Sequence, residues 1–481
     1  MFSSSKIGAL EASRSIRKTI IGKRRSFSGA LSFRTSSSKV NQYSSNAKAL
    51  THNYQIASSY GDVMKSQIDR LKSEGFYREF KTMTRKAGYF PTCRQGTSAY
   101  GASSSRTEAQ LGIDRDVTIW CSNDYLGMGQ NRNVINAMNN AATIHGAGSG
   151  GTRNIGGTHQ FHVDLEIELS SWHRKERALV FANCFSANIA LLQTMGRIFP
   201  DMVILSDADN HSSLIEGIRA SKLKKLIFRH NDVMHLAQLL SDIPHSTPKM
   251  IVFESVYSMD GSVGPIESIC NLAKEYNALT FIDEVHAVGL YGDEGEGWSG
   301  MVNVMDKIDI ISGTLGKAIG VSGGYIAASD LIIDNVRSFA PGFIFSTSPP
   351  PAQCAAAIEA VRIIRDTAGI LLRQQHQTRT MEVRHAMNDL NLPLIKSPSH
   401  ILPLMVGDAF KCKKISDELL EEHGIYIQPI NYPTVPKGTE RLRITPSPVH
   451  SQLMITKLVT ALDSLWTRHN LRRSDWYKSS L

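Results

Sequence analysis

Residues 312–318 read Ser-Gly-Thr-Leu-Gly-Lys-Ala, and residues 281–287, upstream of them, read Phe-Ile-Asp-Glu-Val-His-Ala. Short apolar runs lead into both strings, over residues 308–311 and residues 278–282. Such runs predict buried strands. Lys317 and Asp283 would then lie at the carboxyl ends of two strands, which is the edge where open α/β sheets bind their ligands.

A lysine and an aspartate in these positions indicate a pyridoxal phosphate site. The lysine amine can hold this cofactor as a Schiff base, and a carboxylate opposite the pyridine nitrogen keeps the ring protonated and electron-withdrawing. Either residue alone has a plainer explanation, because lysines are common in strand-to-helix turns and an aspartate after a strand can cap a helix. The two strings together favour the cofactor site, with Lys317 and Asp283 as catalytic residues.

The pattern from residue 117 onward is one of short β-type runs separated by helical stretches. Strands are predicted over residues 178–182, 202–205, 226–229, 250–254, 278–283, 308–312 and 324–328. This spacing favours a mostly parallel sheet wrapped by helices. We therefore predict an α/β fold with a mostly parallel seven-stranded sheet and a smaller C-terminal α+β domain.

Four parts of the chain are predicted. They are a leader over residues 1–55, an N-terminal helix and substrate-contacting segment over 56–116, a large cofactor-binding domain over 117–350 and a small domain over 351–481. Apolar spacing predicts helices over residues 60–88, 355–377 and 451–469, and residues 100–116 are predicted to form a loop. Three consecutive prolines, at 349–351, mark the change of domain.

The formal charge of +9 does not indicate a nucleic-acid-binding protein, because of where the charge lies. Residues 1–50 hold ten Lys or Arg and one acid, which leaves the rest of the chain with no net charge. The basic surface that phosphate backbones require is therefore missing from the folded part. The longest apolar runs are too short to cross a bilayer, so no membrane span is expected.

The basic N-terminal stretch has the composition of a mitochondrial transit peptide, because it is rich in Ser and Arg and poor in acids. Location in the mitochondrial matrix is therefore expected. The six cysteines are scattered and form no C-x-x-C pair, so neither a metal site nor a disulfide framework is predicted.

Several further residues could serve the site. His211 follows the strand predicted over residues 202–205, where its ring could stack on the cofactor, and it could equally cap the next helix. Cys184 and Phe185 open a helix after a strand, a position suited to a phosphate. Arg78 and Arg443 are candidate clamps for small carboxylates, since the guanidinium fork bonds both oxygens at once.

The chain from about residue 60 to 467 resembles the α-oxoamine synthase family of class II, aminotransferase-like pyridoxal phosphate enzymes. Besides the Asp283 and Lys317 motifs, the strings that carry the resemblance are residues 120–128, 146–154, 253–261, 343–347 and 428–436. The resemblance implies a fold-type I homodimer with active sites at the subunit interface. It also implies the condensation of glycine with succinyl-CoA to 5-aminolevulinate, CoA and carbon dioxide, the first step of haem biosynthesis.

The resemblance also assigns roles by motif position. The residues implied to contact the cofactor are Cys184, Phe185, His211, Ser258, Asp283, His286, Thr314 and Lys317, with Ser346 and Thr347 from the other subunit. The residues implied to bind substrate are Arg78, Asn123, Thr152, Asn154, Ser206, Lys225, Thr434 and Arg443. Lys317 and His211 are implied to move protons.

Two alternative functions stay open at the level of sequence. Relatives of this family use other amino acids or acyl-CoA donors, and a second carboxylate on the acyl group would require a buried cation, for which Arg78 is the candidate. A catalytically inactive scaffold subunit with the same fold is the other alternative, and the presence of both Lys317 and Asp283 argues against it.

Overall fold

The computed structural model describes residues 58–96 and 115–474. By its internal contacts the chain divides into Met1–Gln67 and Ile68–Leu481, and the arrangement described below is that of Ile68–Leu481. The predicted leader, residues 1–55, lies outside the described residues, as does most of the loop predicted over 100–116. Arg115 and Asp116, at the end of that predicted loop, are part of a strand.

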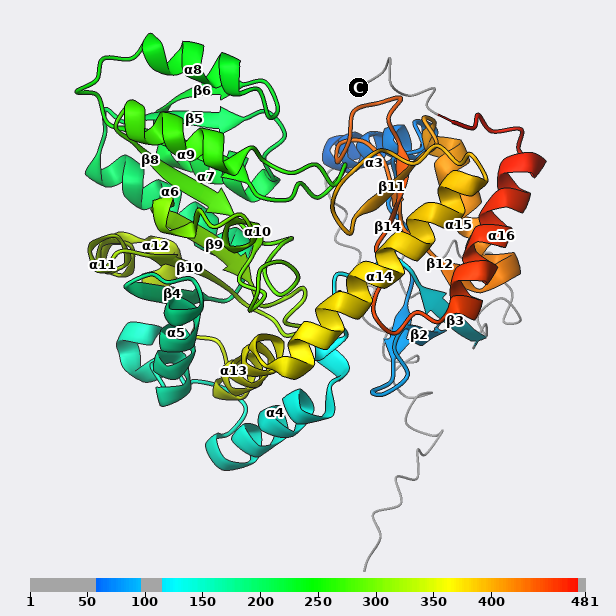
Figure 1. The fold of residues 1–481 in the computed structure, drawn as a ribbon, viewed down its shortest axis with the longest axis horizontal. Coiled ribbons are helices and arrows are strands. Elements are labelled where there is room, and N and C mark those ends of the chain that lie inside the picture. Colours follow the sequence, from blue (N-terminus) through cyan, green and yellow to red (C-terminus); the bar gives the residue numbers. More distant parts are fainter. Residues whose placement is uncertain (1–57, 97–114, 475–481) are drawn as a thin grey trace, which may run out of the picture. The chain divides into compact units, whose positions relative to one another are not determined.

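The prediction of a seven-stranded, mostly parallel sheet is confirmed (Figure 1). In spatial order its strands are β4 (Arg177–Phe181), β10 (Gly324–Ala328), β9 (Ile310–Thr314), β8 (Ala278–Asp283), β7 (Lys249–Glu254), β5 (Val203–Asp207) and β6 (Lys224–Phe228). Only β10 runs antiparallel to its neighbours, and the other pairs are parallel. The parallel strands therefore present their carboxyl ends along one edge.

Helices cover both faces of this sheet, as the alternation of side chains along β7 shows. Met250 and Val252 pack into one apolar cluster, with residues of α6 and α7, whereas Ile251 and Phe253 pack into another with residues of α8 and α9. The helices of this domain are α4 (Arg132–His145), α5 (Gln160–Trp172), α6 (Cys184–Ile198), α7 (Ser212–Ser221), α8 (Val233–Ser241), α9 (Ile266–Glu275), α10 (Trp298–Met301), α11 (Asp330–Phe339), α12 (Pro341–Ile344) and α13 (Pro351–Arg365).

A second core is built around two smaller sheets. One has the order β1 (Met83–Arg85), β2 (Thr92–Gln95), β3 (Arg115–Ile119), β12 (Ile425–Tyr426), and the other β11 (Leu402–Met405), β14 (Arg441–Ile444), β13 (Pro429–Ile430). Three helices cover them, α14 (Thr367–Asp389), α15 (Ala409–His423) and α16 (Gln452–Arg468). The long α14 and the terminal α16 lie side by side, and Val383 and Leu462 belong to the same apolar cluster (Figure 1).

The apolar cores do not follow the order of the chain, and the domain boundary at residue 350 stays a prediction. Val361 and Ile364 of α13 pack with Leu165 and Leu169 of α5, so this helix belongs to the core of the large sheet. Conversely, Thr118 and Ile119 of β3 pair with β12, which joins the start of the segment predicted as the large domain to the small domain. The predicted division followed the chain, whereas the packing brings distant segments together.

Two helix predictions were wrong in length. The helix predicted over residues 60–88 is α3 (Ser58–Ser73), and it ends because Gly75 takes a positive φ of 75°. The N–H groups of Gly75 and Phe76 donate to the carbonyls of Lys72 and Leu71, the bonding pattern of a Schellman cap.

The helix predicted over residues 355–377 is broken in two. The side chain of Asp366 accepts a hydrogen bond from the N–H of Thr367 and so starts α14. Gly369 then lies so close to the carbonyl of Ile364 that a Cβ there would clash. The chain therefore turns between α13 and α14, which lets one helix pack on each core.

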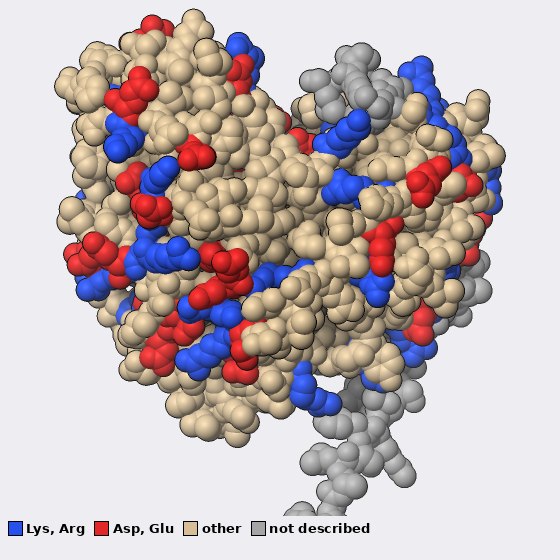
Figure 2. All heavy atoms as spheres, viewed as in Figure 1, with Lys and Arg blue, Asp and Glu red and all other residues tan. Residues whose placement is uncertain are grey.

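Lysines and arginines alternate with aspartates and glutamates over the face drawn in Figure 2. This mixture agrees with the absence of a net charge outside the first fifty residues. Among the residues that the structure describes, no helix is both long and apolar enough to cross a membrane.

We expect Leu462→Ala to lower the free energy of unfolding of the small domain by about 2–5 kcal/mol, because the side chain is 0% exposed and its removal leaves a cavity. Leu453→Ala in the same helix is the matched control, since Leu453 is 78% exposed. Urea unfolding followed by tryptophan fluorescence measures both. Equal midpoints for the two variants would contradict the assignment of this core.

Candidate active site

The site lies where parallel strands of the large sheet end. Asp283, the last residue of β8, is in register with Glu254 at the end of β7 and with Ser312 in β9. Lys317 lies in the turn after β9 and is partly buried. The structure therefore brings Lys317 and Asp283 to the same edge, as the sequence predicted.

Asp283 is held by hydrogen bonds on both oxygens. It is 4% exposed, and it accepts hydrogen bonds from Asn188 Nδ2 at 2.9 Å and from the N–H of Val285 at 2.9 Å. Asn188 also donates to Ser213 Oγ at 2.9 Å. Donors aimed at a buried carboxylate stabilise its charged form and fix its orientation. Sequence reasoning missed Asn188, although it lies one helical turn after Cys184 in α6.

A line of hydrogen bonds runs from Lys317 to Arg443. Lys317 Nζ lies 2.7 Å from His286 Nε2, and His286 Nδ1 lies 2.8 Å from the hydroxyl of Tyr125. Arg443 Nη2 donates to that hydroxyl at 2.9 Å and to Asn123 Oδ1 at 3.1 Å. Four residues predicted for the site are thus linked through Tyr125, which sequence reasoning had not selected from within the string 120–128.

Burial lowers the pKa of two groups in this line, Lys317 and His286. Burial lowers the pKa of Lys317 to about 8, although the carboxylate of Asp283 opposes that shift. Burial and the charge of Lys317 hold the pKa of His286 well below its ordinary value. The Lys317 amine can therefore lose and regain a proton near neutral pH, beside an imidazole that stays uncharged.

His211 lies beside this line at the start of α7. Its N–H donates to Glu254 Oε1 at 2.5 Å, and its ring stands edge-on to Phe185 with 6.4 Å between the ring centres. Burial, followed by the nearby charge of Asp283, raises the pKa of Glu254 well above its ordinary value. His211 as a whole residue is exposed, which agrees with the prediction that a planar group stacks there.

The start of α6 offers donors for an anion. The side chain of Asn183 caps the helix by accepting from the N–H of Ser186 at 2.8 Å, which leaves Cys184 and Phe185 as first-turn N–H groups without intrahelical acceptors. Gly324 packs against the backbone of Cys184 so closely that a Cβ would clash. Thr314, partly buried at the end of β9, accepts from the N–H of Gly316 at 3.1 Å.

A separate group holds Ser346 and Thr347, which are predicted to act on the other subunit's site, together with Thr152 and Asn154, which are predicted to bind substrate. Thr152 and Thr347 form an antiparallel bridge, and Ser348 donates its N–H to the carbonyl of Gly151 at 3.0 Å. Asn154, Ser346 and Thr347 are exposed. Within the described part of this single chain, no hydrogen bond links Thr152, Asn154, Ser346 or Thr347 to Lys317.

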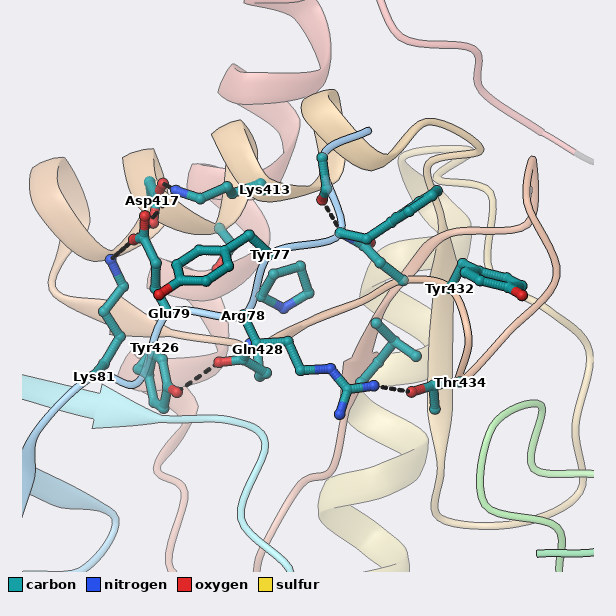
Figure 3. Close-up of a pocket in the computed structure, with 16 residues that line it drawn as sticks. Tyr77, Arg78, Glu79, Lys81, Lys413, Asp417, Tyr426, Gln428, Tyr432 and Thr434 are labelled. Atoms are coloured by element: carbon teal, nitrogen blue, oxygen red, sulfur yellow. Dashed lines mark hydrogen bonds and ion pairs between the residues drawn. The ribbon is translucent and has the colours of Figure 1, made fainter. Parts of the chain in front are cut away.

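Arg78 and Thr434 meet at the wall of a pocket of about 220 Å³. Figure 3 shows the Arg78 side chain reaching toward Thr434, and Nη2 donates to Thr434 Oγ1 at 3.0 Å. Lys81 and Asp417, paired at 3.2 Å, line another part of the wall. The expectation that Arg78 is buried was wrong, because Arg78 lies in the wall of this open pocket and is exposed.

The remaining predicted residues lie apart from the Lys317 line. Ser206 is buried in β5, where it accepts a hydrogen bond from Asn210 Nδ2 at 2.9 Å. Lys225 is exposed on β6, the edge strand of the large sheet. Ser258 is partly buried in the loop that follows β7.

The family model for aminotransferase class I and II matches residues 115–462, and the chain belongs to this family. It is 50% identical over 416 residues to the 5-aminolevulinate synthase 1 of Cereibacter sphaeroides, an alignment that covers 86% of this chain and 99% of that protein. It is 49% identical over 412 residues to the non-specific mitochondrial 5-aminolevulinate synthase of Bos taurus, with 86% of this chain and 62% of that protein covered.

Solved structures agree on the fold. The serine palmitoyltransferase of Sphingomonas wittichii superposes with a TM-score of 0.75 at 25% identity, covering 86% of this chain and 99% of the other. The predicted α/β, fold-type I architecture is therefore confirmed.

The pKa of about 8 at Lys317 leads to a pH-dependent reactivity. At pH 7 roughly a tenth of the Lys317 amines are then neutral, against fewer than about one in a thousand for an ordinary lysine. In protein freed of any bound aldehyde, reductive methylation followed by mass spectrometry should label Lys317 before the exposed Lys225 at pH 7. The rate at Lys317 should rise with pH up to about 8 and then level off. A rate that keeps rising to pH 10 would contradict the lowered pKa.

Proposed function

We propose that the chain is a 5-aminolevulinate synthase that condenses glycine with succinyl-CoA to 5-aminolevulinate, CoA and carbon dioxide, the first step of haem biosynthesis. Curated enzymes of this name are 49% and 50% identical to it over 86% of its length. The structural observation that carries the proposal is the line from Lys317 through His286 and Tyr125 to Arg443, beside the carboxylate of Asp283.

The residues fit pyridoxal 5'-phosphate, the cofactor of this class of enzyme. The cofactor supplies an electron-withdrawing ring that stabilises negative charge developing at a bound amino acid. Its needs are a carboxylate for the ring nitrogen, an amine for the aldehyde and donors for the phosphate. Asp283 with both oxygens hydrogen-bonded, Lys317 with its lowered pKa, and the open N–H groups of Cys184 and Phe185 supply them.

Other residues orient the cofactor in this proposal. His286, kept neutral, donates or accepts at the phenolic oxygen, and His211, an exposed residue, offers its ring for stacking. Thr314 and Ser258 add hydroxyl groups near the carboxyl ends of β9 and β7. Lys317 Nζ, once free, is the base that takes a proton from the Cα of glycine, because a pKa of about 8 suits proton transfer at neutral pH.

The carboxylate of glycine binds to Arg443 and Asn123. Arg443 Nη2 already points at the oxygen of Asn123 and at Tyr125, so the guanidinium is oriented before substrate arrives. A bidentate arginine–carboxylate pair also fixes the Cα–H bond relative to Lys317.

The acyl donor is bound by residues from several segments. Arg78 and Thr434, joined at 3.0 Å, bind the free carboxylate of the succinyl group. Thr152 and Asn154 are assigned to the same group, and Ser206 and Lys225 are also assigned to substrate binding. The exposure of Arg78 supports a guanidinium that is open until the acyl donor covers it.

The active unit in this proposal is a homodimer. Ser346, Thr347, Thr152 and Asn154 form one connected group with exposed members, and in the described part of one chain that group has no hydrogen bond to the Lys317 line. A partner subunit would bring the group to the phosphate and the succinyl end of the other site.

We assign the protein to the mitochondrial matrix. The mitochondrial enzyme of Danio rerio is 45% identical over 468 residues, an alignment that covers 97% of this chain. The net charge of residues 1–50, with ten basic residues and one acid, supports import. The cleavage of residues 1–55 would follow.

The two alternatives make different demands on the site. A synthase for another acyl-CoA needs no cation at Arg78, and an inactive scaffold needs no amine at Lys317. Both groups are present, and Lys317 has the lowered pKa that catalysis requires.

The function is tested with protein truncated near residue 55 and supplied with pyridoxal phosphate, glycine and succinyl-CoA. We expect aminolevulinate from the wild type and a loss of at least about a thousandfold for Lys317→Ala, because the base and the attachment point are lost together. Cofactor binding without product would exclude this acyl donor. Equal product from both proteins would remove Lys317 from the mechanism.

Arg78→Ala should weaken the use of succinyl-CoA by about 2 kcal/mol in kcat/KM, the lower end of the cost of truncating a paired charge, because Arg78 is exposed in the free enzyme. Butyryl-CoA, which lacks the second carboxylate, should be used equally by wild type and variant. Arg132→Ala, on the exposed side of α4, is the control for a lost surface charge. Equal wild-type use of the two acyl donors would remove Arg78 from substrate recognition.

A further inference from the structure

His230 lies just after β6, outside the set of residues used so far, yet it contacts two other segments near the site. Its Nδ1 lies 2.8 Å from Asp207 Oδ1, at the end of β5, and its Nε2 lies 2.9 Å from Ser262 Oγ, in the loop after β7. Its ring also stands edge-on to Tyr257, with 4.4 Å between the ring centres. One imidazole therefore links β5, β6 and that loop.

The loop over residues 257–262 is a compact turn that carries Ser258. The N–H of Gly261 donates to the carbonyl of Tyr257 at 3.1 Å, and Ser262 Oγ donates to Asp260 Oδ1 at 2.9 Å. Asp260 Oδ2 lies 3.8 Å from His230 Nε2. His230 thus holds the turn through both Ser262 and Asp260.

The far side of the same turn touches the small domain. Arg441 of β14 is 3% exposed, and its Nη1 donates to the carbonyl of Met259 at 3.3 Å. Ser399 Oγ, also in the small domain, donates to the carbonyl of Gly261 at 2.8 Å. Gly261 has a φ of 71°, and a Cβ on it would clash with Ser397 and Ser399 of the small domain. The turn therefore packs closely against that domain.

Arg441 and Arg443 share a face of β14. Leu442 and Ile444 alternate with them and point into the small-domain core, so both arginines face the large domain. Arg441 faces Asp260 and Asp209, while Arg443 reaches Asn123 and Tyr125. A shift of β14 relative to the turn would therefore move both arginines together.

We infer that His230 is a positioning residue, which fixes the turn over residues 257–262 against β5. Through Asp260 and Arg441 the turn then fixes the position of β14 relative to the large domain. That position places Arg443 on the glycine carboxylate. The kinetic test of this inference, KM for glycine, rests on the proposed function. The structural test, hydrogen exchange of residues 257–262, does not depend on that function.

The charge of His230 is part of this arrangement. Burial disfavours the charged ring, but the hydrogen bond to Asp207 and the charges of Asp207, Asp209 and Asp260 prevail and raise the pKa of His230 above its ordinary value. The groups that face it are those three carboxylates, the neutral Tyr257 and, beyond Asp260 and Asp209, Arg441. Because its pKa is raised, the ring keeps its proton to a higher pH than an ordinary histidine does, and it loses that proton as the pH rises through the raised pKa. Above it, Asp207, Asp209 and Asp260 lose the positive charge of His230, only Asp209 and Asp260 still face Arg441, and the link loosens.

Kinetics with glycine provide the first test. We expect His230→Gln, which keeps a hydrogen-bonding side chain without the charge, to raise KM for glycine about tenfold at neutral pH and to change kcat less than threefold. In the wild type, KM for glycine should rise with pH through the pKa of His230, and this rise should be absent in His230→Gln. His245→Gln, an exposed histidine on the same domain, is the matched control and should keep the wild-type profile. A wild-type profile in His230→Gln would overturn the inference.

A second variant separates charge from packing. Asp260→Asn should lower the pKa of His230, read from the ring Cε1–H signal in NMR spectra, and should move the rise in KM to lower pH by the same amount. A pKa that moves while the KM profile stays in place would show that His230 does not position Arg443.

Hydrogen exchange tests the same inference without any activity. Amides of residues 257–262 should exchange at least tenfold faster in His230→Gln than in the wild type at one pH, while amides of α16 should not change. If the wild type makes no aminolevulinate, the proposed function fails and this measurement still decides the role of His230. If the wild type is active and exchange is unchanged in the variant, the positioning role fails and the function stands.

Discussion

The buried carboxylate of Asp283 is the constraint on which the site depends. An ionised carboxylate at 4% exposure is costly unless donors surround it, and Asn188 and the N–H of Val285 supply them. Burial lowers the pKa of the Lys317 amine to about 8, and the charge of Asp283 opposes that shift. The same charge adds to burial in raising the pKa of Glu254. One residue at the end of β8 therefore raises the pKa of both Lys317 and Glu254, against the effect of burial at the amine and together with it at the carboxyl.

The small domain supplies Arg443 to the site at the edge of the large sheet. Arg443 comes from β14, yet its partners Asn123 and Tyr125 precede the large sheet in the chain, and Tyr125 contacts His286 after β8. These contacts require that β14 keep its position relative to the sheet. The turn over residues 257–262, between His230 and Arg441, is a physical link that maintains this position.

Strands were easier to predict than the ends of helices. Buried parallel strands such as β7 are continuous apolar runs, and all seven strands of the large sheet were located within a few residues. Helix periodicity does not reveal where a helix stops. The end of α3 depends on the positive φ of Gly75, and the break between α13 and α14 depends on Asp366 and on the close approach of Gly369 to Ile364.

The sequence by itself determined the class of fold and the chemistry, because Lys317, Asp283 and His211 each follow an apolar strand and strand ends meet at one edge of a parallel sheet. Only the tertiary structure decided which other groups join them. Asn188, Tyr125, Glu254 and His230 are ordinary polar residues in the sequence, and their importance comes from through-space contacts with residues far away in the chain. The exposure of Arg78 was likewise decided by its place in the wall of an open pocket. Local patterns encode strands and caps, whereas hydrogen-bond partners and burial are properties of the packed molecule.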